Sequence, residues 1–380
     1  MAYDFDTPID RRNTFSDKWD KYQNTDIIPL WVADMDFASP PAILTALRER
    51  IDHGVLGYTR TPDPLIETVC EHLKNNYQWD VSPEWLVFIP GLVCGLNITC
   101  AATGVANSGA LTATPVYPPF FSAPKNANRR VIPAPLAHTG DRWYFDFDHL
   151  EKSMEPDTRL FLLCNPHNPV GRCFDKEELL AIAELCEKHD LVVCSDEIHN
   201  ELILDPSIKH IPLASLGPEI SRRTITLIAP SKTYNIPGLG ASIAIISDPT
   251  LRAKFKRVMA GIVPHVNVFG LIAALAAYRD CQGWRRELLD YLRGNRDFVA
   301  QSIGKIAGLS VSPVEATYLS WIDTRSLNLE EPAGFFEKAG VGLSDGAAFM
   351  GKGFVRLNFG CPRSTLRTAL QRMEQAVEKR

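Results

Sequence analysis

The chain has 380 residues, of which 45% are apolar and 22% are charged, and its net charge at pH 7 is −5. This length allows one large core and a smaller one, and the composition is that of an ordinary globular protein. The acidic balance offers no general attraction to nucleic acid or to an acidic membrane, and no apolar run reaches the length of a bilayer span.

Short apolar runs alternate with helix-like patterns through the middle of the chain. This alternation is typical of an α/β fold, in which helices cover both faces of a mainly parallel sheet. The runs expected to form strands are Leu86–Ile89, Ala110–Ala113, Val131–Ala134, Arg159–Cys164, Leu191–Cys194, Thr224–Ile228 and Ala241–Ile246. The patterns expected to form helices are Pro41–Ile51, Leu65–Asn75, Lys176–Lys188 and Phe269–Asp280.

The last hundred residues have a different pattern. A long helix is expected at Trp284–Ile306, followed by strands at Tyr318–Ile322 and Phe354–Asn358 and a last helix from about Ser364. We therefore expect a large α/β domain at residues 46–280. A smaller α+β domain is expected to combine residues 1–45 with residues 281–380.

Cysteine usage and the N-terminus suggest a compartment. The nine cysteines are scattered without a Cys-x-x-Cys pair, so we expect neither a disulfide framework nor a metal site. The first residues, Met1–Pro8, are acidic and lack the basic-then-apolar order of a signal peptide. These features predict a cytoplasmic protein.

Three polar residues follow three of the expected strands. Asn168 and Asp196 come after the fourth and fifth runs, and Lys232 comes after the sixth. Taken alone, Asp196 would be an exposed turn acid and Lys232 a solvated loop residue. In a parallel sheet, however, ligands bind outside the carboxyl ends of the strands, so the three side chains are expected to meet in one crevice. A lysine for an imine, an acid for a pyridinium nitrogen and an amide for a phenolic oxygen are what pyridoxal phosphate requires.

Several longer motifs extend this pattern into a resemblance. The chain resembles fold-type I pyridoxal-phosphate enzymes, and within the class I/II aminotransferase superfamily it is similar to the MalY/PatB-type cystathionine β-lyase (C–S lyase) branch. The matching stretches span nearly the whole chain and are Pro29–Phe37, Gly57–Thr59, Cys164–Arg172, Ser195–His199, Ser231–Asn235 and Val355–Arg363.

The resemblance implies roles around the cofactor ring. Lys232 would carry the cofactor as a Schiff base and move the substrate's α-proton. Asp196 would pair with the ring nitrogen, and Asn168 would bond the phenolate oxygen. His199 would support the ring's environment, although a structural histidine is the alternative. Tyr117 would stack on the ring, with a core tyrosine as the alternative.

The resemblance also implies a site for the cofactor's phosphate. The backbone N–H groups of Gly91, Leu92 and Val93 would form a helix-start anion site, supported by Ser231. Tyr58 would reach the phosphate of a neighbouring subunit, so a homodimer is expected.

The substrate's α-carboxylate would be held by Arg356 through a two-pronged contact, and the backbone around Ala33 would touch the same group.

Two positions depart from the pattern of many aminotransferases. Gly240 stands where they carry a phosphate-binding arginine, and Ala229 stands where they often carry serine. Both departures suit the C–S lyase branch better.

These residues predict an enzyme with an amino-acid substrate. The expected reaction is β-elimination on a cysteine S-conjugate such as cystathionine, giving a thiol, pyruvate and ammonia. An aminotransferase acting on an L-amino acid and a 2-oxo acid is the alternative, because the same residues serve both reactions. A cofactor-binding regulatory protein is a further alternative. A nicotinamide dehydrogenase is disfavoured, because no Gly-x-Gly-x-x-Gly opens a βαβ unit.

Overall fold

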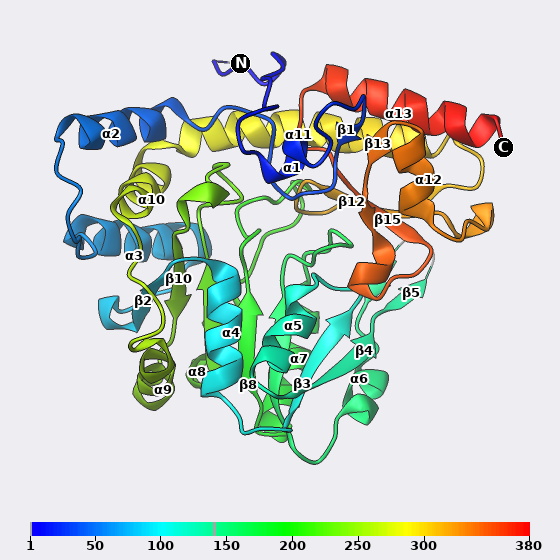
Figure 1. Cartoon of the computed structure of the whole chain (residues 1–380). Helices are drawn as coiled ribbons and strands as arrows, with labels where there is room; N and C mark the ends of the chain where they lie inside the picture. The colour runs from blue at the N-terminus through cyan, green and yellow to red at the C-terminus, as the bar shows by residue number, and fades with distance from the viewer. Residues whose placement is uncertain (1, 140–141) are drawn as a thin grey trace.

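A seven-stranded sheet forms the centre of the molecule in the computed structural model, which describes residues 2–139 and 142–380 (Figure 1). Met1, the first residue of the expected small-domain segment, lies outside this range. The strands, in spatial order, are β2 (Leu86–Ile89), β10 (Ser242–Ile245), β9 (Thr224–Ile228), β8 (Val192–Asp196), β7 (Thr158–Cys164), β3 (Gly109–Thr114) and β4 (Arg130–Pro135). Neighbours from β9 to β4 are parallel, whereas β10 runs antiparallel to both β9 and β2.

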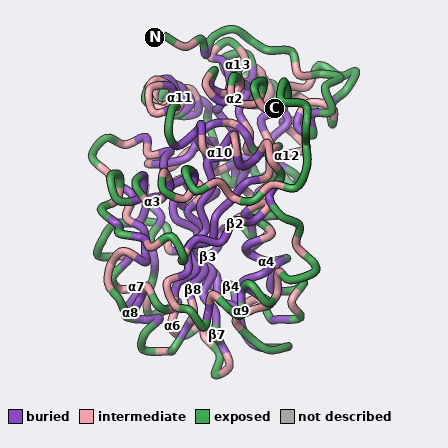
Figure 2. The backbone as a smooth tube through the Cα atoms, turned by 90° about the vertical axis from the view of Figure 1, so that its left-hand side faces the viewer, coloured by how far each residue is buried: buried purple, intermediate pink, exposed green. Residues whose placement is uncertain are grey.

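Helices cover both faces of this sheet, which explains why its strands read as continuous apolar runs. One face packs against α4 (Leu92–Ala102), α5 (Pro119–Asn126) and α9 (Pro249–Met259). The other packs against α6 (Phe147–Ser153), α7 (Lys176–Lys188) and α8 (Pro218–Arg222). The helices α3 (Asp63–Tyr77) and α10 (Val268–Asp280) cover the edge at β2 and β10. In the burial-coloured view, β3 and β8 are buried inside this shell (Figure 2).

A second sheet is antiparallel and has four strands. Its spatial order is β11 (Ser310–Val311), β12 (Leu319–Asp323), β15 (Phe354–Asn358) and β14 (Ser344–Asp345). The long α11 (Gln282–Ile303), α12 (Pro332–Lys338) and α13 (Arg363–Glu378) surround it. A short hairpin, β5 (Ala137–Thr139) and β6 (Arg142–Tyr144), lies outside both sheets.

The N-terminal segment packs with this C-terminal layer. The short helix α1 (Asp17–Asp20) precedes β1 (Ile28–Pro29), which pairs in parallel with β13 (Val341–Gly342), and α2 (Pro41–Asp52) follows. Figure 1 shows α1 and β1 close to the yellow α11 and the red α13, whereas α2 lies on the far side, near α10. One hydrophobic core joins the first and last parts of the chain, with Leu30 and Met35 in the same cluster as Leu357 and Leu366.

The expected α/β fold with a mainly parallel sheet is confirmed. All seven expected apolar runs lie in the central sheet, and α7 has the expected bounds. Asp175 begins α7 with a reciprocal capping box with Glu178. The division at residues 46 and 280 stays a prediction; residue 46 falls within α2, whereas residue 280 ends α10. None of the helices in the described part of the chain has both the length and the apolar character needed to cross a bilayer.

Candidate active site

Three neighbouring parallel strands bring the expected ring-binding residues to one edge of the sheet. Asp196 is the last residue of β8 and pairs in register with Cys164 at the end of β7 and with Leu227 in β9. Asn168 and Lys232 follow β7 and β9 by four residues each. The carboxyl ends of parallel strands form the ligand-binding edge of such sheets, so this convergence follows from the topology.

A cavity of about 700 Å³ opens at this edge. It lies between the central sheet, the loop after β1 and the C-terminal sheet. Among its lining residues are Ala33, Gly91, Leu92, Val93, Tyr117, Asn168, Asp196, His199, Ser231, Lys232 and Arg356. The structure therefore brings together all the expected site residues except Tyr58.

The carboxylate of Asp196 is buried without a bonded cation. Within the described chain it accepts one hydrogen bond, from the backbone N–H of Ile198 at 3.1 Å. Burial raises the pKa of Asp196 to about 7, although that hydrogen bond and the charge of Lys232 act in the opposite direction. A buried carboxylate is costly unless it meets a donor or a cation, so this site fits a protonated ring nitrogen.

The amine of Lys232 faces the N-terminal loop. Its Nζ donates to the carbonyl oxygen of Ala33 at 2.5 Å. Burial lowers the pKa of Lys232 to about 8, and the charge of Arg356 adds to this effect, whereas Asp34 and Asp196 oppose it. A lysine with such a pKa is neutral in a substantial fraction of molecules near pH 8, as a Schiff-base nucleophile requires.

Arg356 lies in the middle of β15, in register with Ser344 of β14. Its Nη1 donates to the Asn168 side-chain oxygen at 3.0 Å, and its Nη2 donates to the Trp31 carbonyl at 2.7 Å and to Ser344 Oγ at 3.2 Å. Among the described residues it has no carboxylate partner, and its Nε has no hydrogen-bond partner. Burial lowers the pKa of Arg356 to about 10. A buried guanidinium without a counter-ion fits a substrate carboxylate.

Asn168, His199 and Tyr117 also line this cavity, and their side chains fit an aromatic cofactor. Asn168 uses its side-chain oxygen for Arg356, which leaves its amide N–H groups as donors. The buried imidazole of His199 packs edge-on against Tyr318, and its Nδ1 has no partner in the described chain. Burial, together with Lys232 and Arg356, lowers the pKa of His199 to about 3, so the ring is neutral at physiological pH. Tyr117 lines the same cavity just before α5.

The expected phosphate site lies at the start of α4. Gly91 is the N-cap residue, with no side-chain cap, so the first N–H groups of the helix remain available. A Cβ atom at Gly91 would meet no atom within 4 Å. The open space beside free amides and Ser231 fits an anion.

Gly240 closes this side of the cavity and explains a departure from the aminotransferase pattern. Its φ of +57° is left-handed, and a Cβ there would lie 2.9 Å from the carbonyl oxygen of Pro90. An arginine at this position would require a different backbone.

Tyr58 lies outside the cavity. Its side chain is fully exposed, and it lines a separate groove formed by residues 56–60 and 264–268. Its expected role therefore depends on a second subunit and stays a prediction.

The site also contains residues that sequence reasoning did not single out. Trp31 and Ser344 contact Arg356, the hydroxyl of Tyr318 donates to the Ala33 carbonyl at 2.9 Å, and the Phe349 ring lies 4.8 Å from the guanidinium carbon of Arg356. Trp31 lies in the Pro29–Phe37 motif that contributed to the resemblance. No sequence motif marks Ser344. Its position beside Arg356 comes from the pairing of the two-residue strand β14 with β15.

A family model described as "Aminotransferase class I and II" matches residues 25–373 of this chain. The chain belongs to the class I and II aminotransferase family. It is 38% identical to "Cystathionine beta-lyase PatB" of Bacillus subtilis, over 98% of this chain and 99% of that protein.

Two solved structures are also similar to this chain over nearly their full length. The crystal structure of OvoB has a TM-score of 0.97 and 48% identity, covering 99% of each chain. Cystalysin from Treponema denticola, which contains a pyridoxal 5'-phosphate cofactor, has a TM-score of 0.95 and 34% identity, covering 100% of each chain. The resemblance stated from the motifs is confirmed.

Proposed function

We propose that this protein is a pyridoxal-phosphate-dependent carbon–sulfur β-lyase that acts on a cysteine S-conjugate such as cystathionine. The observation that carries the proposal is the common cavity of Lys232, Asp196 and Arg356. This cavity contains a lysine amine, a buried acid and a guanidinium without a carboxylate partner, which together support binding of an amino acid and an aromatic cofactor. The choice of β-elimination is supported by the relative named cystathionine β-lyase.

The cofactor, when bound, supplies the electron sink that makes the α-proton of an amino acid removable. Lys232 is the group proposed to hold the cofactor and then to accept that proton at Nζ. Asp196 is proposed to keep the ring nitrogen protonated, an electrostatic contribution already in place before reaction. Asn168 is proposed to donate to the ring oxygen, with Tyr117 against the ring face and His199 beside it.

The substrate is proposed to bind through its α-carboxylate at Arg356, near the backbone of Ala33. The phosphate is proposed to lie at Gly91, Leu92 and Val93, with Ser231 as a further donor. Binding the substrate's carboxylate at Arg356 and the cofactor's phosphate at α4 would orient the substrate's α-hydrogen toward Lys232.

The balanced reaction is a cysteine S-conjugate plus water giving a thiol, pyruvate and ammonia. The α-proton leaves to Lys232, and the carbon–sulfur bond breaks with its electron pair on sulfur. The sulfur then takes up a proton, and water hydrolyses the three-carbon enamine that remains.

We further propose a cytoplasmic homodimer in which Tyr58 completes the phosphate site of the neighbouring subunit. The full exposure of Tyr58 outside its own cavity supports this assembly. The free state of all nine cysteines supports a reducing compartment.

The aminotransferase alternative is supported by the family model and by the similar structure of a putative aminotransferase from Clostridium difficile. An assay with cystathionine or an S-alkyl cysteine, without a 2-oxo acid, separates the two reactions. Equal amounts of pyruvate and thiol support the lyase. Amino transfer that depends on a 2-oxo acid, without thiol release, overturns it.

A further inference from the structure

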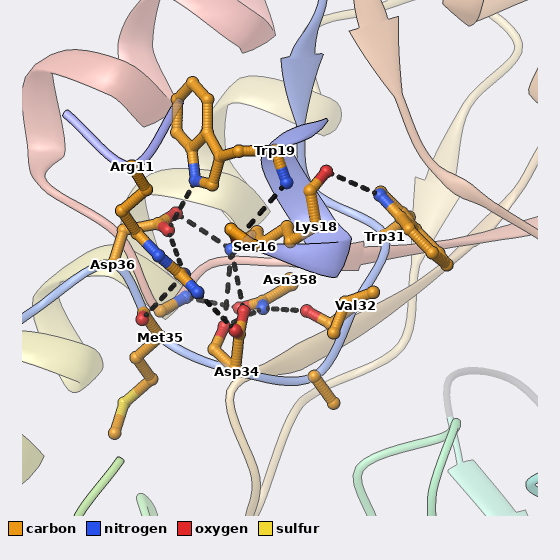
Figure 3. Close-up of polar contacts among 12 residues, drawn as sticks. Arg11, Ser16, Lys18, Trp19, Trp31, Val32, Asp34, Met35, Asp36 and Asn358 are labelled. Carbon is orange, nitrogen blue, oxygen red and sulfur yellow. Dashed lines mark hydrogen bonds and ion pairs between the residues drawn. The ribbon is translucent and has the colours of Figure 1, made fainter. Parts of the chain in front are cut away.

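A group of charged side chains holds the loop that reaches into the cavity. We call Arg11, Lys18, Asp34 and Asp36 the N-terminal charge cluster (Figure 3). Lys18 Nζ lies 2.8 Å from one oxygen of Asp36 and 3.6 Å from Asp34. Arg11 reaches both acids at 2.7 Å. Trp19 adds a 2.8 Å indole hydrogen bond to Asp36.

The centre of this cluster is removed from solvent. The Lys18 side chain is 0% exposed and that of Asp36 is 4% exposed. Burial alone would raise the pKa of Asp36, but Lys18, Trp19 and Arg11 together outweigh it and lower the pKa. Two cations matched to two acids make the cluster neutral, whereas loss of one partner would leave a buried charge unpaired.

The loop held by this cluster also has contacts elsewhere. Met35 and Phe37 are buried in the core, and the side chain of Asn235 bonds to the backbone of both residues. Strand β1 ends at Pro29, and the next helix begins at Pro41. Lys18 contacts the loop in three ways. Its Nζ pairs with the two acids and donates to the Asp34 carbonyl at 3.3 Å. Its backbone carbonyl accepts a hydrogen bond from Trp31 Nε1 at 3.1 Å. Figure 3 shows these contacts of Lys18 as dashed lines.

The same loop presents two carbonyl groups to the site. The Trp31 carbonyl accepts from Arg356, and the Ala33 carbonyl accepts from Lys232. Asn358, two residues beyond Arg356 on β15, donates to the Val32 and Asp34 carbonyls at 2.5 and 2.6 Å. The loop therefore lies between the charge cluster on one side and the reacting side chains on the other.

We propose that Lys18 is a positioning residue, which with Arg11 and Asp36 fixes the loop so that the Trp31 carbonyl holds Arg356 in its working orientation. The inference rests on the proposed function for the role of Arg356 in binding the carboxylate of the amino acid. A loop displaced by about 1 Å would misplace the guanidinium of Arg356, and such errors reduce kcat/KM by roughly 10²-fold.

The test compares Lys18→Met with Arg12→Met, whose pair with Asp10 is exposed to solvent. Hydrogen exchange of the amides of residues 31–37 is measured on the full chain, with and without cofactor. In Lys18→Met we expect this exchange to accelerate about tenfold or more, while the amides of the central sheet keep their protection. In Arg12→Met we expect no change.

The second readout is amino-acid binding. With L-alanine, followed by the absorbance of the bound cofactor, we expect the dissociation constant to rise roughly ten- to hundred-fold in Lys18→Met. With a lyase substrate, KM should rise by a similar factor and kcat should change less. L-alanine binding does not require β-elimination, so failure of the proposed reaction would be distinguishable from failure of this inference.

A variant that keeps the cluster neutral covers the case in which Lys18→Met does not fold. Lys18→Met combined with Asp36→Asn removes both charges and is expected to fold while retaining the fast loop exchange and the weak L-alanine binding. Unchanged exchange at residues 31–37 with wild-type affinity for L-alanine, in either variant, would overturn the proposal. So would uniformly faster exchange across the whole chain with that affinity unchanged.

Discussion

The Nζ atom of Lys232 lies 2.5 Å from the carbonyl oxygen of Ala33, a residue 199 positions earlier in the chain. This contact joins the ligand-binding edge of the central sheet to the N-terminal loop. It gives the amine a hydrogen-bond acceptor while burial lowers its pKa to about 8. Lys232 is therefore positioned by the central sheet and by the N-terminal loop.

Asp196 should make the stability of the cofactor-free protein depend on pH. Its folded pKa of about 7 exceeds the ordinary value of 3.8, so between these values the folded state holds a proton that the unfolded state releases. Stability must then fall as pH rises through this window, by at most about 4 kcal/mol. Asp196→Asn should lack this loss and be the more stable protein at neutral pH.

Urea unfolding of both cofactor-free proteins from pH 4 to pH 8 measures this difference. Exposed Asp190, changed to Asn, is the matched control and should follow the wild type. If the free energies of unfolding of wild type and Asp196→Asn differ by the same amount at every pH from 4 to 8, the buried carboxyl does not titrate in this range.

Arg356→Lys should weaken substrate binding more than cofactor binding. Lysine cannot make the two-pronged contact, and the loss of one charge-assisted hydrogen bond corresponds to roughly a 10- to 100-fold rise in KM for the amino acid. Steady-state kinetics and cofactor titration separate the two effects. Arg325→Lys serves as the control, because its guanidinium is exposed and pairs with Asp323 away from the cavity. A wild-type KM in Arg356→Lys would remove this residue from the carboxylate site.

Gly240→Ala should destabilise the protein by about 1–3 kcal/mol, because the left-handed backbone disfavours a Cβ that also approaches Pro90. Gly238→Ala, two residues earlier, is the control, since a Cβ there meets no atom within 4 Å. Chemical denaturation gives both free energies of unfolding. Equal stability of the two variants would count against a strained backbone at residue 240.

Tyr58→Phe should raise the dissociation constant of the cofactor about 10- to 100-fold, because a hydrogen bond to a charged phosphate is lost. Tyr144→Phe is the exposed control.

If Tyr58 serves the neighbouring subunit, hybrid dimers of Tyr58→Phe with Lys232→Ala contain one intact site. They should recover roughly half of the wild-type activity at limiting cofactor. No recovery in purified hybrids would place Tyr58 outside the partner's site.

Much of the fold could be predicted because the central strands are buried on both faces and read as unbroken apolar runs. The orientation of β10 could not, since periodicity carries no strand direction. Asn168, Asp196 and Lys232 could be placed together because each follows a strand of one parallel sheet. Lys18 could not, because a buried lysine in a polar N-terminal segment has no local signal; only tertiary contact with Asp36 explains it.

The cavity is proposed to direct an amino acid toward carbon–sulfur cleavage. The most direct measurement is a time course of pyruvate and thiol released from cystathionine per protomer, with no 2-oxo acid present. We predict continuous release of both products in equal amounts, far beyond one equivalent, and none from Lys232→Ala. Release of no thiol, with consumption of the amino acid stopping near one equivalent per protomer, would contradict carbon–sulfur cleavage and indicate half of an amino-transfer reaction.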